Sequence, residues 1–246
     1  MLKAMQNLLI VLCLVPACLY AGDLEELLAR NEAAVGGAEN WAKIDNVRVQ
    51  LTIEEPDFEV DATYVASREG RMRIDILMNG KRVFSEGLDD SGQAWQWTQA
   101  DGIKLQNEQS AAALRHGIQF PGRFFTLMDL YRSGTSVTLE GQVLEEDNTQ
   151  WRVRVTLADD FSRDYFVDDA TALIVREHDR RAFHPAADPT AVLIETRKEE
   201  PDWLNGVLLY QVSKNSNLAT GEWLATTRVR STEHNIELPD DYFQPQ

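Results

Sequence analysis

Apolar and polar residues alternate through most of this sequence, and no other feature constrains the fold as strongly. In residues 47–53 every second residue is Val, Leu or Ile, and Arg, Gln and Thr stand between them. The same alternation appears in residues 58–64 and 72–78. Shorter runs recur to the end of the chain, at residues 83–84, 95–97, 137–139, 151–157, 165–167, 173–175, 192–194, 207–212 and 223–229. A period of two is typical of strands that bury one face, and such strands in succession predict an antiparallel sheet.

The alternation stops between residues 107 and 133, where a helical pattern replaces it. Residues 111–115 are strong helix formers, and Pro121-Gly122 interrupts them. Apolar residues then recur at spacings of three and four over residues 124–131. These features predict two short helices joined at Pro121-Gly122. One further helix is expected near the start of the chain, over residues 23–35.

The predicted fold is mainly β (α+β). About ten strands with few helices favour a strongly curved antiparallel sheet that forms a half-open barrel, capped by the short helices. Pro185 and Pro189 mark a loop rather than a linker, because the strand pattern is the same on both sides. Residues 22–246 are therefore expected to form a single domain. An open barrel with helices across its mouth has room for an apolar ligand.

Residues 1–21 are typical of a secretory signal peptide. Lys3 supplies a positive charge, residues 8–14 form an apolar run, Pro16 breaks the run, and Ala21 is a small residue at the expected cleavage point. The whole apolar stretch, from Leu8 to Tyr20, is 13 residues long, shorter than the roughly 20 residues that cross a bilayer as a helix. We therefore expect a secreted protein with no transmembrane segment in the mature chain.

The same segment allows an alternative. Residues 15–18 (Val-Pro-Ala-Cys) match a possible lipobox, in which Cys18 would be lipidated and would anchor the protein to a membrane. Cleavage after Ala21 would instead remove both cysteines, Cys13 and Cys18. The secreted form would then have no disulfide, no thiol nucleophile and no cysteine metal site. The free secreted form is the expectation, and the form anchored at Cys18 is its alternative.

The charge of the chain excludes one class of partner. Asp and Glu number 40 against 24 Lys and Arg, which gives a formal net charge of −16. Such a chain has no basic surface to neutralise phosphates, so no nucleic-acid partner is expected. The same charge disfavours docking on anionic lipid headgroups.

The sequence offers little for catalysis or for a metal. His178 and His184 are the closest histidine pair, and a separation of six residues across a loop is not the spacing of metal ligands on one helix. The pairs Asp159-Asp160 and Asp168-Asp169 lack the regular oxygen spacing of a calcium loop, so we expect them in turns. No nucleophile elbow, phosphate-binding glycine loop or dinucleotide fingerprint is present. We expect no catalytic residue, no metal and no cofactor, with a glycosidase-like pair of carboxylates as the open alternative.

Several local motifs occur in an order that spans most of the mature chain. They are Ala34–Glu39 (AVGGAE), Asp90-Ser91-Gly92 before Trp95, Arg123–Gly134, Tyr165–Leu173 (YFVDDATAL), Asn205-Gly206-Val207 and Asn235–Phe243 (NIELPDDYF). In these motifs the sequence resembles bacterial outer-membrane lipoprotein-sorting proteins of the LolA-like superfamily. The resemblance implies a half barrel of about eleven strands capped by helices, which binds acyl chains in its concave apolar interior and works in the periplasm. The sequence departs from the family pattern at Asp159–Ser162, where a glycine is expected, and at Tyr210, where relatives often carry proline.

The candidate ligand-binding residues are apolar residues on the predicted wall and lid of the half barrel. They are Val49, Leu51, Phe58, Val60, Tyr64, Met72, Ile74, Ile76, Trp95 and Trp97 on strands, and Phe124, Phe125 and Met128 on the helical segment. Any one of them could be ordinary core. The signal segment, the many strands, the helical insert and the resemblance together favour a ligand.

The expected function is that of a non-enzymatic periplasmic carrier. It would shield the acyl chains of a lipoprotein or lipid from water and pass them from one membrane-associated protein to another. The alternative, from a different class, is an envelope sensor or interaction module that binds lipid or protein without transfer. Transfer of labelled lipid distinguishes the two, because only the carrier predicts it.

Overall fold

The computed structural model describes residues 19–184 and 188–246. Within them the chain forms many strands and few helices, as the sequence pattern predicts. The helices are α1 (Leu19–Ala34), α2 (Ala38–Trp41), α3 (Glu108–Gln119) and α4 (Leu127–Arg132). The strands are β1 (Asn46–Glu55), β2 (Phe58–Ser67), β3 (Met72–Met78), β4 (Lys81–Leu88), β5 (Ala94–Thr98), β6 (Gly102–Leu105), β7 (Ser136–Glu145), β8 (Asn148–Thr156), β9 (Ser162–Asp168), β10 (Ile174–Arg181), β11 (Val192–Leu204), β12 (Val207–Asn217) and β13 (Trp223–His234).

Two predictions for the start of the chain are not addressed by this structure. The signal peptide over residues 1–21 lies almost entirely outside the described residues, as does the alternative lipid attachment at Cys18. A search of the described helices finds none with the length and apolarity that a membrane span requires.

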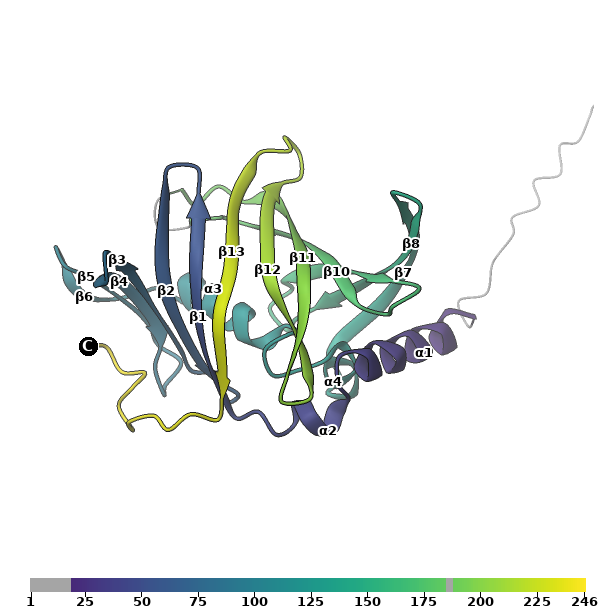
Figure 1. Ribbon diagram of the computed structural model, residues 1–246, viewed down its shortest axis with the longest axis horizontal. Helices are drawn as coiled ribbons and strands as arrows, with labels where there is room; N and C mark the ends of the chain where they lie inside the picture. Colours follow the sequence, from purple (N-terminus) through teal and green to yellow (C-terminus); the bar gives the residue numbers. More distant parts are fainter. Residues whose placement is uncertain (1–18, 185–187) are drawn as a thin grey trace, which may run out of the picture.

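All the described strands belong to one strongly curved antiparallel sheet that does not close (Figure 1). The strand order is β6-β5-β4-β3-β2-β1-β13-β12-β11-β10-β9-β8-β7. Each half of the sheet is a meander of sequential hairpins, and the two halves meet in one ladder between β1 and β13, where Val47 pairs with His234 and Glu54 with Thr226. The predicted fold, a curved half-open sheet with short helices, is confirmed.

The sheet has thirteen described strands where about eleven were expected. The strand with no counterpart in the sequence pattern is β6, which has four residues and forms one edge of the sheet. Both of its apolar residues, Ile103 and Leu105, are exposed. Ile103 and Leu105 alternate with Lys104, but all three side chains are exposed, so this short alternation marks no buried face.

The concave face of the first meander forms one apolar core. Cross-strand partners share a face of a sheet, and the partners here are Val49 with Tyr64 and Leu51 with Ala62. Helix α3 covers this face with Ala111 and packs on its residues. The helix begins at an N-cap, Asn107, whose side chain accepts from the Ser110 amide at 2.9 Å.

A second apolar core lies between the helices and the other meander. Leu28 of α1 and Leu127 of α4 pack with Val153 of β8 and Tyr165 of β9, and all four are fully shielded from solvent. Helix α4 begins with a capping box between Thr126 and Asp129. The two helices that the sequence predicted between residues 107 and 133 are therefore confirmed as α3 and α4.

The turn between α1 and α2 is docked on the hairpin of β11 and β12. The carbonyl of Val35 accepts hydrogen bonds from the Leu208 amide and from the Trp41 indole, each at 3.0 Å. Gly36 lies against the backbone of Gly206, which turns the hairpin. This contact holds α2 beneath the lower end of the sheet.

Candidate functional site

Most of the predicted wall residues lie together on the concave apolar face. They are Val49, Leu51, Tyr64, Met72, Ile74 and Ile76. Val60 is buried and shares their face, because it pairs with Ile53. Phe58 is apart from them: it lies at the tip of the β1-β2 hairpin with 45% of its surface exposed.

The placement expected for the two strand tryptophans is wrong. Trp95 pairs with Gly87, which pairs with Arg73, so these residues lie on the opposite face of the sheet from Met72. Trp95 is fully buried there, and its indole nitrogen donates to the Phe243 carbonyl at 2.9 Å. Its burial comes from the C-terminal segment rather than from the concave interior.

Trp97 follows the same alternation. It pairs with Ser85 on that outer face, and the guanidinium of Arg82 lies 4.2 Å from its ring centroid. The alternation correctly placed the two tryptophans on one face of one strand. It could not say which face, because both faces of β5 are covered by other parts of the chain.

The predicted lid residues divide between the two cores. Phe124 is fully buried in the core of the first meander, and Met128 belongs to the core of the second. Phe125 contacts both cores. The segment between α3 and α4, residues 120–126, therefore packs between the two halves of the sheet. It is called the wedge below.

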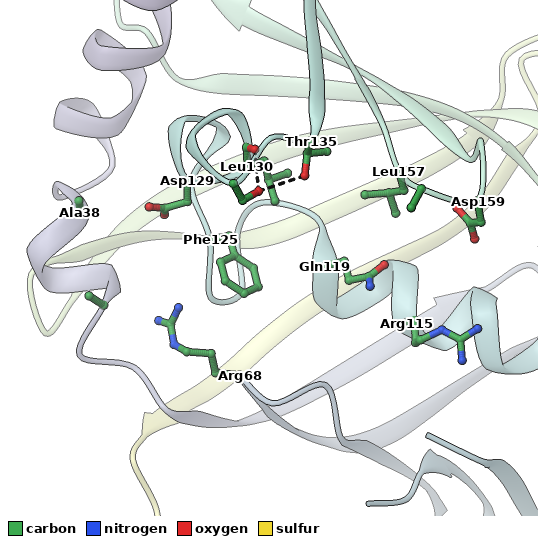
Figure 2. Close-up of a pocket in the computed structure, with 13 residues that line it drawn as sticks. Ala38, Arg68, Arg115, Gln119, Phe125, Asp129, Leu130, Thr135, Leu157 and Asp159 are labelled. Carbon is green, nitrogen blue, oxygen red and sulfur yellow. Dashed lines mark hydrogen bonds between the residues drawn. The ribbon is translucent and has the colours of Figure 1, made fainter. Parts of the chain in front are cut away.

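An open groove runs beneath this wedge, with a volume of about 620 Å³ (Figure 2). Its lining comes from α2, the end of β2, α3, α4 and the β8-β9 turn, and more of its surface is apolar than polar. The apolar side chains in the lining are Ala38, Ala42, Phe125, Leu130, Leu157 and Ala158; the polar ones are Arg68, Arg115, Gln119, Asp129, Ser133, Thr135 and Asp159. Of all the residues predicted from the sequence, only Phe125 lines it.

Both carboxylates of the groove are already engaged. Asp129 accepts from the amide and the hydroxyl of Thr126 in the capping box, at 2.8 and 2.9 Å. Asp159 contacts the His116 ring at 2.7 Å, and this hydrogen bond lowers the pKa of its carboxyl group. Both carboxylates therefore already have hydrogen-bond partners within the described chain.

A charged cluster interrupts the apolar surface of the concave face at β9 and β10. Arg163 lies between the carboxylates of Glu177 at 3.3 Å and Asp179 at 2.7 Å, and its guanidinium stacks on the ring of Phe120 at 4.3 Å. Burial acts to lower the pKa of Arg163, but the electrostatic effects of Tyr165, Glu177 and Asp179 outweigh it and raise that pKa.

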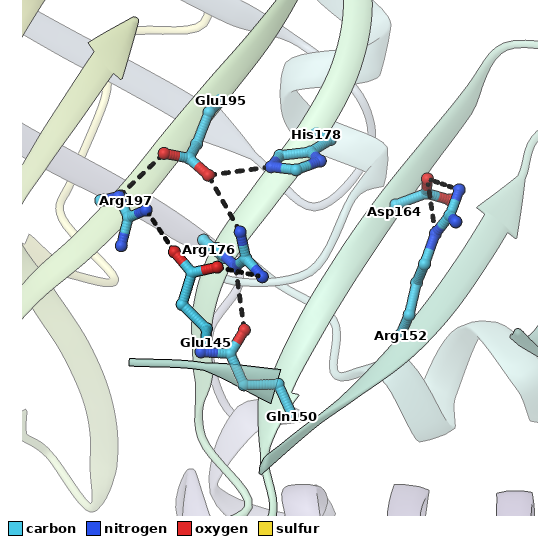
Figure 3. A network of polar contacts seen from close by, with 8 residues as sticks. All are labelled: Glu145, Gln150, Arg152, Asp164, Arg176, His178, Glu195 and Arg197. Atoms are coloured by element: carbon cyan, nitrogen blue, oxygen red, sulfur yellow. Dashed lines mark hydrogen bonds and ion pairs between the residues drawn. The ribbon is translucent and has the colours of Figure 1, made fainter. Parts of the chain in front are cut away.

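The largest polar network lies on the outer face of the second meander (Figure 3). Arg176 bridges Glu145 and Glu195, each at 3.2 Å, and Arg197 joins the same two carboxylates. His178 contacts Glu195 at 2.9 Å. The network joins β7, β8, β10 and β11. In the described part of the chain no group of three or more His, Cys, Asp or Glu residues is placed to hold a metal ion.

A separate ion-pair cluster on the same face, Asp164 with Arg152 and Arg154, predicts a specific acid sensitivity. Burial acts to raise the pKa of Asp164, but hydrogen bonds from Arg154 and Arg152 outweigh it and lower that pKa. A carboxyl group with a lowered pKa in the folded state stabilises the protein above its unfolded pKa of about 3.9, and this contribution is lost as the pH falls through the folded value. Asp164→Asn is expected to cost about 1 to 2 kcal/mol at pH 7, because both arginines are partly exposed. Urea titrations from pH 7 to pH 2 should show a shallower loss of stability in the variant.

The matched control is Asp57→Asn, which changes an exposed carboxylate in the β1-β2 turn. It should leave both the stability at pH 7 and the acid slope of the wild type unchanged. An Asp164→Asn protein as stable as the wild type at pH 7 would contradict the ion-pair assignment.

Comparison with known proteins places the fold. No protein-family model matches the sequence, and no curated protein matches it. Three solved structures cover 89% of this chain at 10% identity: a DUF1329 family protein from Desulfovibrio piger (TM-score 0.59, 96% of that chain), a LolA superfamily protein from Nitrosomonas europaea (0.57, 96%) and an outer membrane lipoprotein-sorting protein domain from Vibrio parahaemolyticus (0.56, 95%). At this identity the likeness is one of fold.

Proposed function

We propose that this protein, which has the LolA-like fold, binds the acyl chain of a lipid or lipoprotein in its groove and carries it through the periplasm. The observation that supports this most is the groove itself, an open cavity of about 620 Å³ with a mainly apolar lining. Sites for small molecules commonly measure about 300 to 1,000 Å³ and combine apolar walls with a few polar groups. The groove has both properties.

The wedge between α3 and α4 gives the groove a route to the concave face. Phe125 lines the groove and also packs on both apolar cores. Gly122, beside Pro121, has a φ of +99°, a conformation in which glycine is favoured. A rotation at this point would move Phe125 and join the groove to the apolar residues of β1 to β4. In this proposal the wedge is a lid, and those residues are the inner part of the ligand site.

The energetics suit a carrier better than a storage protein. Moving a sixteen-carbon chain from water into an apolar site gains roughly 13 kcal/mol, at about 0.8 kcal/mol per methylene. Moving it from a membrane into the same site gains almost nothing, because the membrane interior is equally apolar. A protein of this kind can therefore accept a chain from one membrane-associated partner and release it to another.

The decisive experiment measures binding and transfer separately. Binding of a fluorescent fatty acid to the purified mature protein tests the groove. Transfer of a labelled lipid or lipoprotein from donor to acceptor vesicles then tests the carrier. Binding with no transfer would favour an envelope sensor or interaction module, and the absence of both would refute the proposal.

Blocking the groove should abolish binding. Ala158 is an exposed alanine in the β8-β9 turn and lines the groove. Replacing it with tryptophan is expected to fill the cavity and weaken fatty-acid binding at least about tenfold, a loss of roughly 1.4 kcal/mol, measured by fluorescence titration. Ala100→Trp is the matched control, because Ala100 is also an exposed alanine in a turn, between β5 and β6. Equal affinities in the two variants would show that the ligand binds elsewhere.

A further inference from the structure

We propose that the groove selects amphiphiles that carry an anionic head group, a carboxylate or a phosphate, and that Arg68 is the residue that binds this group. The inference rests on the proposed function, because it names the class of acyl ligand that the groove accepts. It is carried by the position and the unpaired charge of one side chain.

Arg68 is held at one end of the groove by contacts that fix its guanidinium group (Figure 2). It follows the last residue of β2, and its Nε donates to the Ile44 carbonyl at 2.9 Å. A terminal nitrogen donates to the Trp41 carbonyl at the end of α2. The guanidinium also lies 5.3 Å from the ring centroid of Phe125. The side chain is therefore placed before any ligand arrives.

These contacts leave the charge of Arg68 without a counterion. Arginine stays protonated in proteins and has five N–H donors. Two of these go to carbonyl oxygens, which carry no formal charge, and Arg68 forms no ion pair with a carboxylate of the described chain. The other charged side chains of the lining all have polar side-chain or backbone partners. Arg115 pairs with Glu108, and Asp159 contacts His116. Asp129 forms the capping box with Thr126.

An uncompensated cation beside an apolar wall is costly unless an anion joins it. The guanidinium is a planar fork that fits a carboxylate or a phosphate through two parallel hydrogen bonds. A head group bound there would place its acyl chain against Phe125 and Leu130 in the same groove. The whole chain has a net charge of −16, so its surface as a whole does not attract anions. A preference for an anion is therefore a property of this site.

The test compares ligands that share one alkyl chain and differ only in the head group. Dodecanoate, dodecyl phosphate, dodecanol and dodecyltrimethylammonium are titrated into the purified mature protein by calorimetry, below their micelle concentrations. The two anions are expected to bind at least about tenfold more tightly than dodecanol, as a charge-assisted hydrogen bond predicts. The cation should bind most weakly. A preference for dodecanoate would indicate free fatty acids, and a preference for dodecyl phosphate would indicate phospholipid head groups.

Three variants assign the effect to its residue. Arg68→Gln should reduce the affinity for both anions to that for dodecanol and leave the affinity for dodecanol unchanged, which also shows that the groove is intact. Arg68→Lys keeps the charge but loses the fork, so its preference for anions should be intermediate. Arg180→Gln is the control, because Arg180 is an exposed arginine on β10 that donates to the Ala191 carbonyl at 3.1 Å and lies outside the groove, so this variant should keep the full preference.

The outcomes separate this inference from the function on which it rests. Equal binding of dodecanoate and dodecanol by the wild type, or an unchanged preference in Arg68→Gln, would overturn the role of Arg68 while leaving acyl binding in place. If no alkyl ligand binds the wild type, the proposed function itself fails. Should Arg68→Gln not fold, an Arg68→Lys protein with the full wild-type preference would still count against recognition by the fork.

Discussion

Replacing Gly36 with alanine is expected to cost at least about 4 kcal/mol of folding free energy, a loss that few single substitutions reach. Gly36 has a φ of +114°, and a Cβ atom there would lie 2.1 Å from the carbonyl oxygen of Gly206. The atoms that the Cβ would meet all belong to the backbone, and the position of a Cβ is fixed by its own backbone, so no side-chain rotation relieves the contact. The α1-α2 turn would have to leave the β11-β12 hairpin and give up the hydrogen bond between Leu208 and Val35. Urea denaturation followed by circular dichroism measures the loss.

The neighbouring glycine gives a matched control. Gly37 also has a positive φ, +78°, but a Cβ atom there would meet nothing within 4 Å. Because Gly37 has a ψ of 153°, Gly37→Ala should cost only the penalty for a backbone conformation that glycine alone adopts readily, about 1 to 3 kcal/mol. If the two variants lost the same stability, the close approach of the turn to the hairpin would not be what makes Gly36 necessary.

The second large effect is expected at Trp95. This side chain is fully buried on the outer face of the sheet, and its indole hydrogen bond holds the Phe243 carbonyl. Trp95→Ala is expected to cost about 3 to 5 kcal/mol, as the loss of a buried aromatic side chain usually does. It should also release the C-terminal segment, which hydrogen exchange at Tyr242 and Phe243 can detect. Fatty-acid binding should persist, because Trp95 lies on the opposite face from the concave interior.

Trp97→Ala provides the comparison, since Trp97 is on the same strand but only half buried. Its loss should be about 1 kcal/mol, mainly from the stacked Arg82. A Trp95→Ala protein that keeps its full stability but no longer binds fatty acid would contradict this assignment. It would show that Trp95 belongs to the ligand-binding wall, as the sequence predicted.

The alternation of residues predicted the sheet well because it is a direct consequence of burial. Leu51 is buried and Gln50 beside it is exposed, and the hydrophobic effect imposes that contrast on any strand with one covered face. The same rule explains where prediction failed. In β5 Trp95 faces the C-terminal segment, and the identity of the covering element depends on tertiary contacts far along the chain. In β6 Ile103 and Leu105 alternate with Lys104, but the run is short and neither apolar side chain is buried, so it was not recognised as a strand.

The groove could not have been found from the sequence. Its lining residues come from the ends of several elements and include small side chains such as Ala38 and Ala158, which follow no period. Arg68 gave no signal either, because the role proposed for it depends on its having no ion pair with a carboxylate of the described chain. Phe125 was identified because the helical spacing of residues 124–131 pointed to the wedge, which contacts both the cores and the groove.

The single ladder between β1 and β13 has a consequence for the order in which the chain can fold. Every other ladder of the sheet joins strands that are neighbours in sequence, so each meander can assemble from local hairpins. The central ladder pairs Val47 with His234, and it must wait until nearly the whole chain has been made. At about 5 to 20 residues per second, the inner edge of β1 stays unpaired on the ribosome for roughly ten to forty seconds. During that time the nascent chain has an open strand edge at the centre of its future sheet, where a chaperone can hold it unfolded.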